Sequence, residues 1–404
     1  MYKCNLCKKK LVKICYNIFV QKMLRRFKMK VISMFSGAGG LDLGFSLAGH
    51  EIVWANDFDE YAVDTYEENF NRFNKHKVVR GDILEYLKQD EKKLKKEIPD
   101  ADIVIGGFPC QGFSIANINR SMEDERNFLY LQVLKMIKLK NPKFILLENV
   151  KGLENMEKGK ILDMIIKDIE SIGKGYTVYY NVLNALNYGV PQNRERVIIF
   201  GVRNDYAKKI KMPISDTIDS KKPKKRLFVK ATHSKDSEIK QKTNTYLVVT
   251  DMFNKLCNNE TININDYFDE DKQYQYQTLR DTIFGLPEET NVDNCEILNH
   301  TSSKCKLNQK KAHMVGNRPT YWDKHSPTIM GRGSGTGGPL IIPHPEYNRR
   351  MSVREVARIQ SFPDTFLFLG STSACYRQIG NAVPVLMAYN IAKIFPIKIE
   401  DFLN

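Results

Sequence analysis

The stretch KVISMFSGAGGLDLGFSLA, residues 30–48, predicts a buried strand over 30–35, a tight turn over 36–40 and a helix over 41–48. A strand, a turn and a helix in this order bring backbone N–H groups and a helix N-terminus close to a ligand. The turn SGAGG lacks the G-x-G-x-x-G spacing, so it does not indicate a dinucleotide. A nicotinamide-dependent dehydrogenase is therefore disfavoured.

The alternation of strand and helix continues to residue 203. Strands are predicted over 51–55, 77–79, 101–105, 143–147, 177–183 and 197–202, and helices over 59–70, 128–139 and 160–172. This order predicts an α/β fold with a Rossmann-like parallel sheet covered by helices on both faces. Residues 111–127 are polar and aperiodic, and we expect them to form a long loop that acts as a lid.

The pattern changes after residue 203. Lys, Asn, Asp and Tyr dominate the following residues, and GRGSGTGG at 331–338 is a glycine-dense loop or hinge. Ser352 and Glu355 then have the spacing of a capping box, and a closing helix is expected over 385–394. The predicted organisation is a basic leader, a catalytic domain, a second, smaller irregular domain and a return to the catalytic domain, with bounds 1–28, 29–203, 204–350 and 351–404.

The composition is that of a globular protein with a polyanionic partner. The 62 Lys and Arg residues exceed the 47 Asp and Glu residues, which gives a net charge of +15. Residues 1–30 hold ten basic and no acidic residues, so 15 − 10 leaves only +5 for the remainder. Lys13 interrupts the apolar part of the leader and no cleavage site follows, so a signal peptide is not predicted. No apolar run reaches the roughly 20 residues of a membrane span.

The eight cysteines are scattered, which argues against a disulfide framework and for a reducing, cytoplasmic setting. Cys4 and Cys7 have the spacing of half a zinc site. A second close pair is missing, so no metal is predicted.

Two carboxylates follow predicted strands. Asp57 lies about twenty residues past the first glycine of the turn, where such folds place a carboxylate on a ribose hydroxyl, and Asp82 ends the next strand. This spacing favours an adenosine-containing cofactor. The alternative is a simple glycine turn with a solvated aspartate.

Cys110 follows the predicted strand over 101–105 and stands between a proline and a glutamine in GGFPCQGFS, residues 106–114. Ligands and reacting groups gather at the carboxyl edge of open α/β sheets, so this thiol is placed to attack rather than to pack. The alternative is a small buried residue in a turn, because most free cysteines are inert.

Six blocks along the chain resemble, in order, the DNA (cytosine-5) methyltransferases of bacterial restriction–modification systems. They are FSGAGG at 35–40, GFPCQ at 107–111, ENV at 148–150, QNRER at 192–196, REVARIQ at 354–360 and GNAVP at 380–384. The blocks lie within 30–203 and 351–395, so the leader and the middle region are outside the resemblance. Ala382 departs from the pattern, since many relatives carry serine there.

The resemblance implies that the Cys110 thiolate adds to C6 of cytosine and so places electron density on C5, which is otherwise too poor a nucleophile. Glu148 would hold the ring at N3 and the exocyclic amine, and Arg196 would bond to O2. Arg194 would lie beside the nucleophile and the phosphates. The alternative for both arginines is a surface ion pair with Glu195.

The resemblance also implies S-adenosylmethionine as the cofactor and a cytosine swung out of double-stranded DNA into the pocket. The cofactor contacts would be Phe35, Gly37, Gly39, Asp57, Phe58, Asp82, Ile83, Pro109, Leu129, Asn381 and Val383. Phe35 and Phe58 have an alternative role as core aromatics. The candidate DNA contacts are Gln111, Ser114, Asn149, Arg332 and Thr336, the last two in a target-recognition region placed only by position and length.

Two other functions remain open from the sequence. A cytosine-5 methyltransferase that acts on RNA would use the same fold and the same cysteine, although the long middle region favours a reader of duplex DNA. A DNA-binding regulator would use the basic leader as an arm, but the complete catalytic blocks argue against this as the sole role. We expect a cytoplasmic monomer and a cognate restriction endonuclease that cuts the same site without binding the enzyme.

Overall fold

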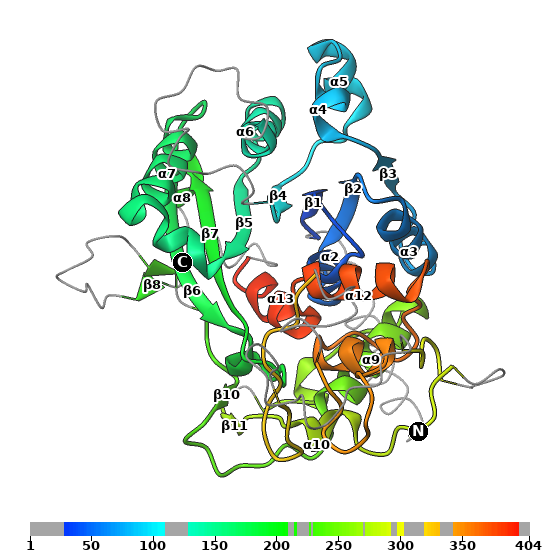
Figure 1. The fold of residues 1–404 in the computed structure, drawn as a ribbon. Coiled ribbons are helices and arrows are strands. Elements are labelled where there is room, and N and C mark those ends of the chain that lie inside the picture. The colour runs from blue at the N-terminus through cyan, green and yellow to red at the C-terminus, as the bar shows by residue number, and fades with distance from the viewer. Residues whose placement is uncertain are drawn as a thin grey trace, which may run out of the picture.

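The structure, a computed structural model of the 404-residue chain, describes residues 28–109, 128–208, 214–215, 226–227, 229–269, 271–291, 297–302, 319–331 and 342–395. Its described part is built on a nine-stranded sheet with the order β3-β2-β1-β4-β5-β7-β6-β9-β8 (Figure 1). The strands are β1 (Lys30–Met34), β2 (Glu51–Asp57), β3 (Lys77–Arg80), β4 (Ile103–Gly106), β5 (Phe144–Val150), β6 (Tyr176–Asn184), β7 (Glu195–Arg203), β8 (Ile214–Ser215) and β9 (Arg226–Leu227). A separate pair joins β10 (His233–Ser234) to β11 (Tyr274–Gln275).

The carboxyl ends of the central strands meet at one edge of the sheet. Met34 of β1 pairs in parallel with Gly106 of β4, and Gly106 pairs with Leu147 of β5. The chain winds outward through β2 and β3 on one side of β1 and through β4 and β5 on the other. The gap between β1 and β4 is therefore a topological switch point, which is where open α/β sheets bind ligands.

The α/β fold is confirmed, but the expectation of a fully parallel sheet is wrong at β7. This strand runs antiparallel to both of its neighbours, β5 and β6. The connection from β6 to β7 covers only residues 185–194, and a parallel crossover needs about a dozen residues or more. The reversal pairs Arg196, at the start of β7, with Val150, at the end of β5.

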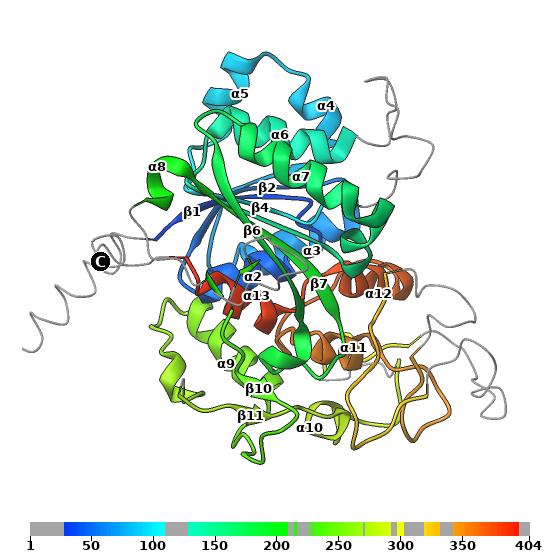
Figure 2. The same ribbon diagram turned by 90° about the vertical axis from the view of Figure 1, so that its left-hand side faces the viewer.

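Helices cover both faces of the sheet, as predicted (Figure 2). Both faces of β1 are apolar and need cover. Consecutive residues of a strand point to opposite faces, and Val31 belongs to one apolar cluster while Ile32 belongs to the other. One face carries α4 (Ile83–Leu87), α5 (Glu91–Glu97), α6 (Phe128–Lys140) and α7 (Lys160–Ser171), and the other carries α2 (Gly40–Leu47), α3 (Glu60–Phe70) and α13 (Val385–Ala392).

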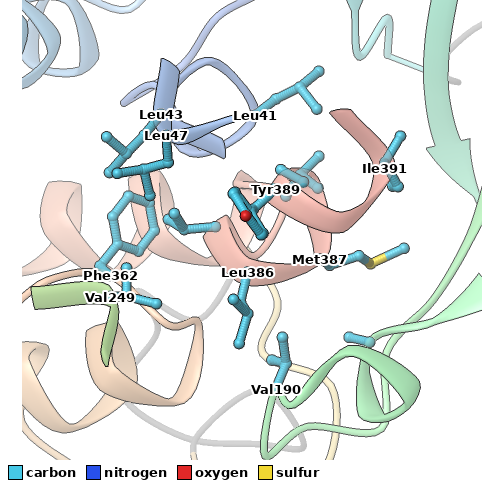
Figure 3. Packing of buried hydrophobic residues seen from close by; sticks show 14 of the residues in the cluster. Leu41, Leu43, Leu47, Val190, Val249, Phe362, Leu386, Met387, Tyr389 and Ile391 are labelled. Carbon is cyan, nitrogen blue, oxygen red and sulfur yellow. The ribbon is translucent and has the colours of Figure 1, made fainter. Parts of the chain in front are cut away.

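Helix α13, near the C-terminal end of the described chain, packs on α2. A Cβ atom added at Gly44 would lie only 2.4 Å from the Cβ atom of Ala388, so the two helices approach as closely as glycine allows. Figure 3 shows Leu43 and Leu47 of α2 beside Phe362, and Leu386 of α13 pointing toward Val190. This contact places the glycine turn over residues 36–40, which precedes α2, against the segment that precedes α13.

The region after residue 203 is less irregular than its sequence suggests. Its 13-residue helix α9 (Thr245–Cys257) buries Val249 and Phe253 in the same apolar cluster as α2 and α13, and α8 (Asn204–Ala207) and α10 (Leu279–Ile283) are short. This apolar cluster contains residues from both sides of position 204. The boundary predicted there stays a prediction. The capping box of Ser352 and Glu355 is confirmed at the start of α11 (Val353–Ile359), and α12 (Thr372–Asn381) follows.

A buried polar network joins β1, α2 and α3. Asp42, fully buried on α2, accepts hydrogen bonds of 2.8 Å from the hydroxyls of Ser33 and Tyr66, and the Tyr66 oxygen lies 3.1 Å from Nε2 of His76. No cation contacts this carboxyl among the described residues. Desolvation by burial raises the pKa of Asp42 to about 7, and burial lowers the pKa of His76 to about 4.

We expect the Asp42→Asn variant to have a flatter dependence of stability on pH than the parent protein. The folded state binds a proton at Asp42 below about pH 7, whereas the unfolded chain releases it above the ordinary aspartate pKa of 3.8. The contribution of Asp42 to the free energy of unfolding therefore falls as the pH rises from about 4 to about 7, by at most about 4 kcal/mol. Urea unfolding of both proteins at pH 5 and pH 7.5 measures the difference, and parallel pH profiles would contradict this assignment.

Candidate active site

Glu148 and Arg196 form an ion pair at the carboxyl end of β5. Glu148 pairs with Ile198 and Val150 pairs with Arg196 in the antiparallel ladder, so the two charged residues are diagonal neighbours on one face. Nε of Arg196 lies 2.8 Å from Oε1 of Glu148, and both side chains are about nine-tenths buried. The guanidinium also donates to the carbonyl oxygen of Glu195 at 2.8 Å. A partly desolvated carboxylate is thereby held in one orientation.

Glu195 has a different partner. Nζ of Lys151 lies 2.8 Å from Oε2 of Glu195, on the exposed side of the strand. The alternative in which the two arginines form a surface ion pair with Glu195 is therefore wrong.

The segment that leads to Cys110 is fixed beside Glu148. Nδ2 of Asn149 donates to the carbonyl oxygen of Phe108 at 3.0 Å, and the Phe108 ring is buried. A Cβ atom added at Gly107 would lie 3.0 Å from Oε2 of Glu148, so glycine lets the carboxylate approach this backbone. Cys110 itself lies outside the described residues, and the last residue described before it is the exposed Pro109.

Asn149 is a predicted substrate contact, and this role stays a prediction. Its side chain is 3% exposed and is used to hold the Phe108 backbone. The remaining DNA-contact candidates, Gln111, Ser114, Arg332 and Thr336, lie with Cys110 outside the described residues.

Arg194, predicted to lie beside the nucleophile and the phosphates, is buried in the structure. Its side chain is 1% exposed, and its role toward DNA stays a prediction. Its guanidinium donates to the carbonyl oxygens of Ile329, Gly380 and Ala382 at 2.8, 3.0 and 2.9 Å. Desolvation lowers the pKa of this buried arginine. Arg194 thus ties the start of β7 to the chain before the glycine-dense loop and to the GNAVP block.

The glycine turn after β1 leaves open space at Gly37 and is tightly packed at Gly39. Gly37 has φ +54°, and a Cβ atom added there would meet no heavy atom within 4 Å. Gly39 has φ +88°, and a Cβ atom there would lie 2.5 Å from the Phe70 ring, so only glycine fits. The N–H of Gly37 donates to Oδ2 of Asp57 at 2.8 Å, which joins the turn to the end of β2.

Asp57 and Phe58 supply a carboxylate and an aromatic ring in consecutive positions at the end of β2. Oδ1 of Asp57 accepts from the N–H of Asp59 at 2.9 Å, and desolvation raises the pKa of Asp57. A carboxylate has about four lone-pair positions, so these two bonds leave room for a ribose hydroxyl. Phe58 is 77% exposed, and its alternative role as a core aromatic is wrong. An exposed ring next to a carboxylate fits the flat base and the ribose of an adenosine group.

The other predicted cofactor residues lie around this edge in different environments. Asp82 is exposed and caps α4 by accepting from the N–H of Leu84 at 2.8 Å. Ile83 is buried in the apolar cluster beneath it, and Phe35 and Leu129 are partly buried against the same cluster. The core alternative for Phe35 thus keeps support from its packing.

The GNAVP block completes the edge. A Cβ atom added at Gly40 would lie 2.4 Å from the carbonyl oxygen of Val383, and one added at Gly331 would lie 1.8 Å from Oδ1 of Asn381. Asn381 is exposed at the end of α12. The glycine turn therefore contacts both the end of β2 and the GNAVP block at this edge of the sheet.

Two buried glutamines belong to this site and escaped the sequence reasoning. Nε2 of Gln192 donates to Oε1 of Gln360 at 3.0 Å, and Oε1 of Gln192 accepts from the N–H of Ile329 at 2.9 Å. Gln192 and Gln360 occur in two of the six blocks of this sequence, QNRER and REVARIQ, but no spacing rule predicts that they meet. They join the QNRER block to Ile329 and to Ile379, which directly precedes the GNAVP block.

The described residues contain no group of three or more His, Cys, Asp or Glu side chains that could hold a metal ion. Cys4 and Cys7, the half-site of the sequence analysis, lie outside the described residues. No helix in the described part of the chain has the length and apolar character needed to cross a membrane.

Comparison with known proteins matches this chain to one family and to several of its members. The model of the C-5 cytosine-specific DNA methylase family matches residues 29–395. The chain is 36% identical to the Type II methyltransferase M.NgoFVII of Neisseria gonorrhoeae over 378 residues, which cover 93% of this chain and 88% of the relative. It is 33% identical to the Type II methyltransferase M.FnuDI of Fusobacterium nucleatum over 397 residues, which cover 90% of this chain and 93% of the relative.

A solved structure shares the fold. The DNMT2 mutant of Spodoptera frugiperda superposes with a TM-score of 0.58 at 20% identity, and the match covers 91% of this chain and 99% of the other.

Proposed function

The chain belongs to the C-5 cytosine-specific DNA methylase family, and from this premise we propose that it methylates C5 of a flipped-out cytosine in a specific duplex sequence through a covalent bond between Cys110 and C6. As a family member it is a DNA (cytosine-5)-methyltransferase that uses S-adenosylmethionine as methyl donor. The observation that carries the proposal is the ion pair of Glu148 and Arg196, at 2.8 Å, beside the backbone that leads into Cys110.

The cofactor fits the residues at the switch point. The open turn at Gly37, the carboxylate of Asp57 and the exposed ring of Phe58 would hold its ribose and base. When bound, S-adenosylmethionine supplies an electrophilic methyl group. Asp82 and Asn381 would contribute polar contacts to this site.

The reaction needs three actions from the chain. The Cys110 thiolate adds to C6, which makes C5 nucleophilic. Glu148 then shares a proton with N3 as electron density builds on the ring, and Arg196 keeps the carboxyl oriented while its remaining N–H groups face O2. After methyl transfer, loss of the C5 proton allows the thiolate to leave and restores the aromatic ring.

A duplex hides both C5 and C6, so the cytosine must leave the helix. We propose that residues 111–127 close behind the extruded base and that the region 204–350 reads base edges and phosphates. Within this proposal Gln111, Ser114, Arg332 and Thr336 are DNA contacts. A bacterial restriction–modification setting, with an endonuclease for the same site, fits the Type II relatives, and we propose that the enzyme acts as a cytoplasmic monomer.

Methyl transfer to duplex DNA, tested beside tRNA in one assay with a labelled methyl donor, tests the proposed function. We expect label in DNA only, and bisulfite sequencing of DNA from cells that express the protein should show one protected cytosine in a fixed sequence. Label in tRNA alone would favour the RNA-directed alternative. Absence of label in both substrates would overturn the proposal.

A further inference from the structure

Arg377 and Asp59 form an ion pair that joins two halves of the proposed cofactor pocket. Nε and Nη2 of Arg377 lie 3.0 and 2.8 Å from Oδ2 of Asp59, although 318 residues separate them in the sequence. It is a salt bridge between the described ranges 28–109 and 351–395. The Arg377 side chain is 42% exposed and that of Asp59 is 18% exposed.

On the Asp59 side, the ion pair continues into the cofactor residues through hydrogen bonds. Oδ1 of Asp59 caps α3 by accepting from the N–H groups of Tyr61 and Ala62 at 3.1 and 3.3 Å. The N–H of Asp59 donates to Oδ1 of Asp57 at 2.9 Å, and Oδ2 of Asp57 accepts from Gly37 at 2.8 Å. Asp59 therefore fixes the carboxylate that we assign to the ribose.

On the Arg377 side, the ion pair acts through α12. Asn381 ends this helix four residues after Arg377, so the two side chains share one face. The turn before α12 also packs on α3, because a Cβ atom added at Gly370 would lie 2.6 Å from the Tyr61 ring. The ion pair and this contact together set the position of α12 against the end of β2.

We infer that Arg377 and Asp59 are positioning residues whose ion pair holds Asp57 and Asn381 at the separation that S-adenosylmethionine requires. The inference rests on the proposed function, because it assumes the cofactor site described above. Neither residue has to touch the cofactor. A partly exposed ion pair contributes little to global stability, so its loss should weaken cofactor binding without unfolding the protein.

Titration calorimetry with S-adenosylmethionine in the absence of DNA tests this inference on the full chain. Asp59→Asn keeps a good helix cap but removes the charge, and Arg377→Gln removes the guanidinium. We expect each single variant to raise Kd about three- to fivefold. The double variant should be no weaker than either single one, because both changes break the same interaction.

Two controls separate this role from a general structural one. The exposed pair Arg280 and Asp323, at 2.8 Å, should tolerate Arg280→Gln and Asp323→Asn with no change in Kd for the cofactor. In the Asp59 and Arg377 variants, kcat at saturating cofactor and KM for DNA should equal those of the parent enzyme. Phe58→Ala, which removes the exposed ring, should weaken cofactor binding and so verifies the assay.

Multiplicative effects of the two substitutions, an unchanged Kd, or an equal loss of kcat at saturating cofactor would overturn the positioning role. Absence of binding by the parent protein is a different result, because it would remove the proposed cofactor site itself and the inference with it.

Discussion

Replacing Glu148 with glutamine is expected to lower kcat by about 10²- to 10⁴-fold, the usual contribution of a positioned acid or base. The amide of Glu148→Gln keeps the size of the side chain and can still accept the hydrogen bond from Arg196, which lies at 2.8 Å. It cannot share a proton with N3 of the base. The loss should therefore appear in single-turnover methyl transfer, while Kd for S-adenosylmethionine stays within about threefold of the parent value.

The matched control for this variant is Glu195→Gln. Glu195 is a neighbouring carboxylate at the start of β7, but it pairs with Lys151 on the exposed side. We expect this variant to retain parental kcat. Equal effects of the two substitutions, or a Glu148→Gln enzyme that is as fast as the parent, would remove Glu148 from the mechanism.

The Cys110→Ser variant should show the largest loss of activity. A serine hydroxyl is almost entirely protonated near neutral pH, whereas a cysteine is already a few per cent thiolate and is intrinsically more nucleophilic. Loss of a catalytic nucleophile lowers kcat on the order of 10⁵-fold or more. Turnover assays with duplex DNA measure this effect, and DNA binding by gel shift should persist.

Cys257→Ser provides the control for Cys110→Ser. Cys257 lies at the end of α9 and is only partly buried, and burial raises the pKa of its thiol. This variant should keep full activity. Activity retained by Cys110→Ser but lost in Cys257→Ser would show that the nucleophile is misassigned.

Sequence patterns were sufficient for the features that depend on local chemistry. The apolar runs before Gly37, Asp57 and Glu148 predict strands, and the structure places all three residues just past or near the carboxyl ends of strands in one sheet. Capping of α11 by Ser352 is equally local and was predictable from a three-residue spacing.

Features that depend on long-range packing were not predictable from the sequence. The antiparallel direction of β7 follows from the short connection after β6. Apolar periodicity predicts that a strand forms but not the direction in which it runs. The position of the Arg194 side chain depends on hydrogen bonds to the carbonyl groups of Ile329 and Gly380, which are more than a hundred residues away in the sequence. Helix α9 was missed because its surroundings are polar, and its stability comes from burial of Val249 and Phe253 on another segment.

The central claim is a covalent bond between Cys110 and the target base, and it is tested most directly with duplex DNA that carries 5-fluorocytosine at the methylated position. Fluorine at C5 blocks the proton loss that releases the enzyme, so the adduct should accumulate. In the presence of S-adenosylmethionine, the account predicts a protein–DNA complex that survives denaturing electrophoresis. Mass spectrometry of its peptides should locate the attached base on the peptide that contains Cys110. An active enzyme that leaves no adduct, or an adduct that still forms with Cys110→Ser, would contradict it.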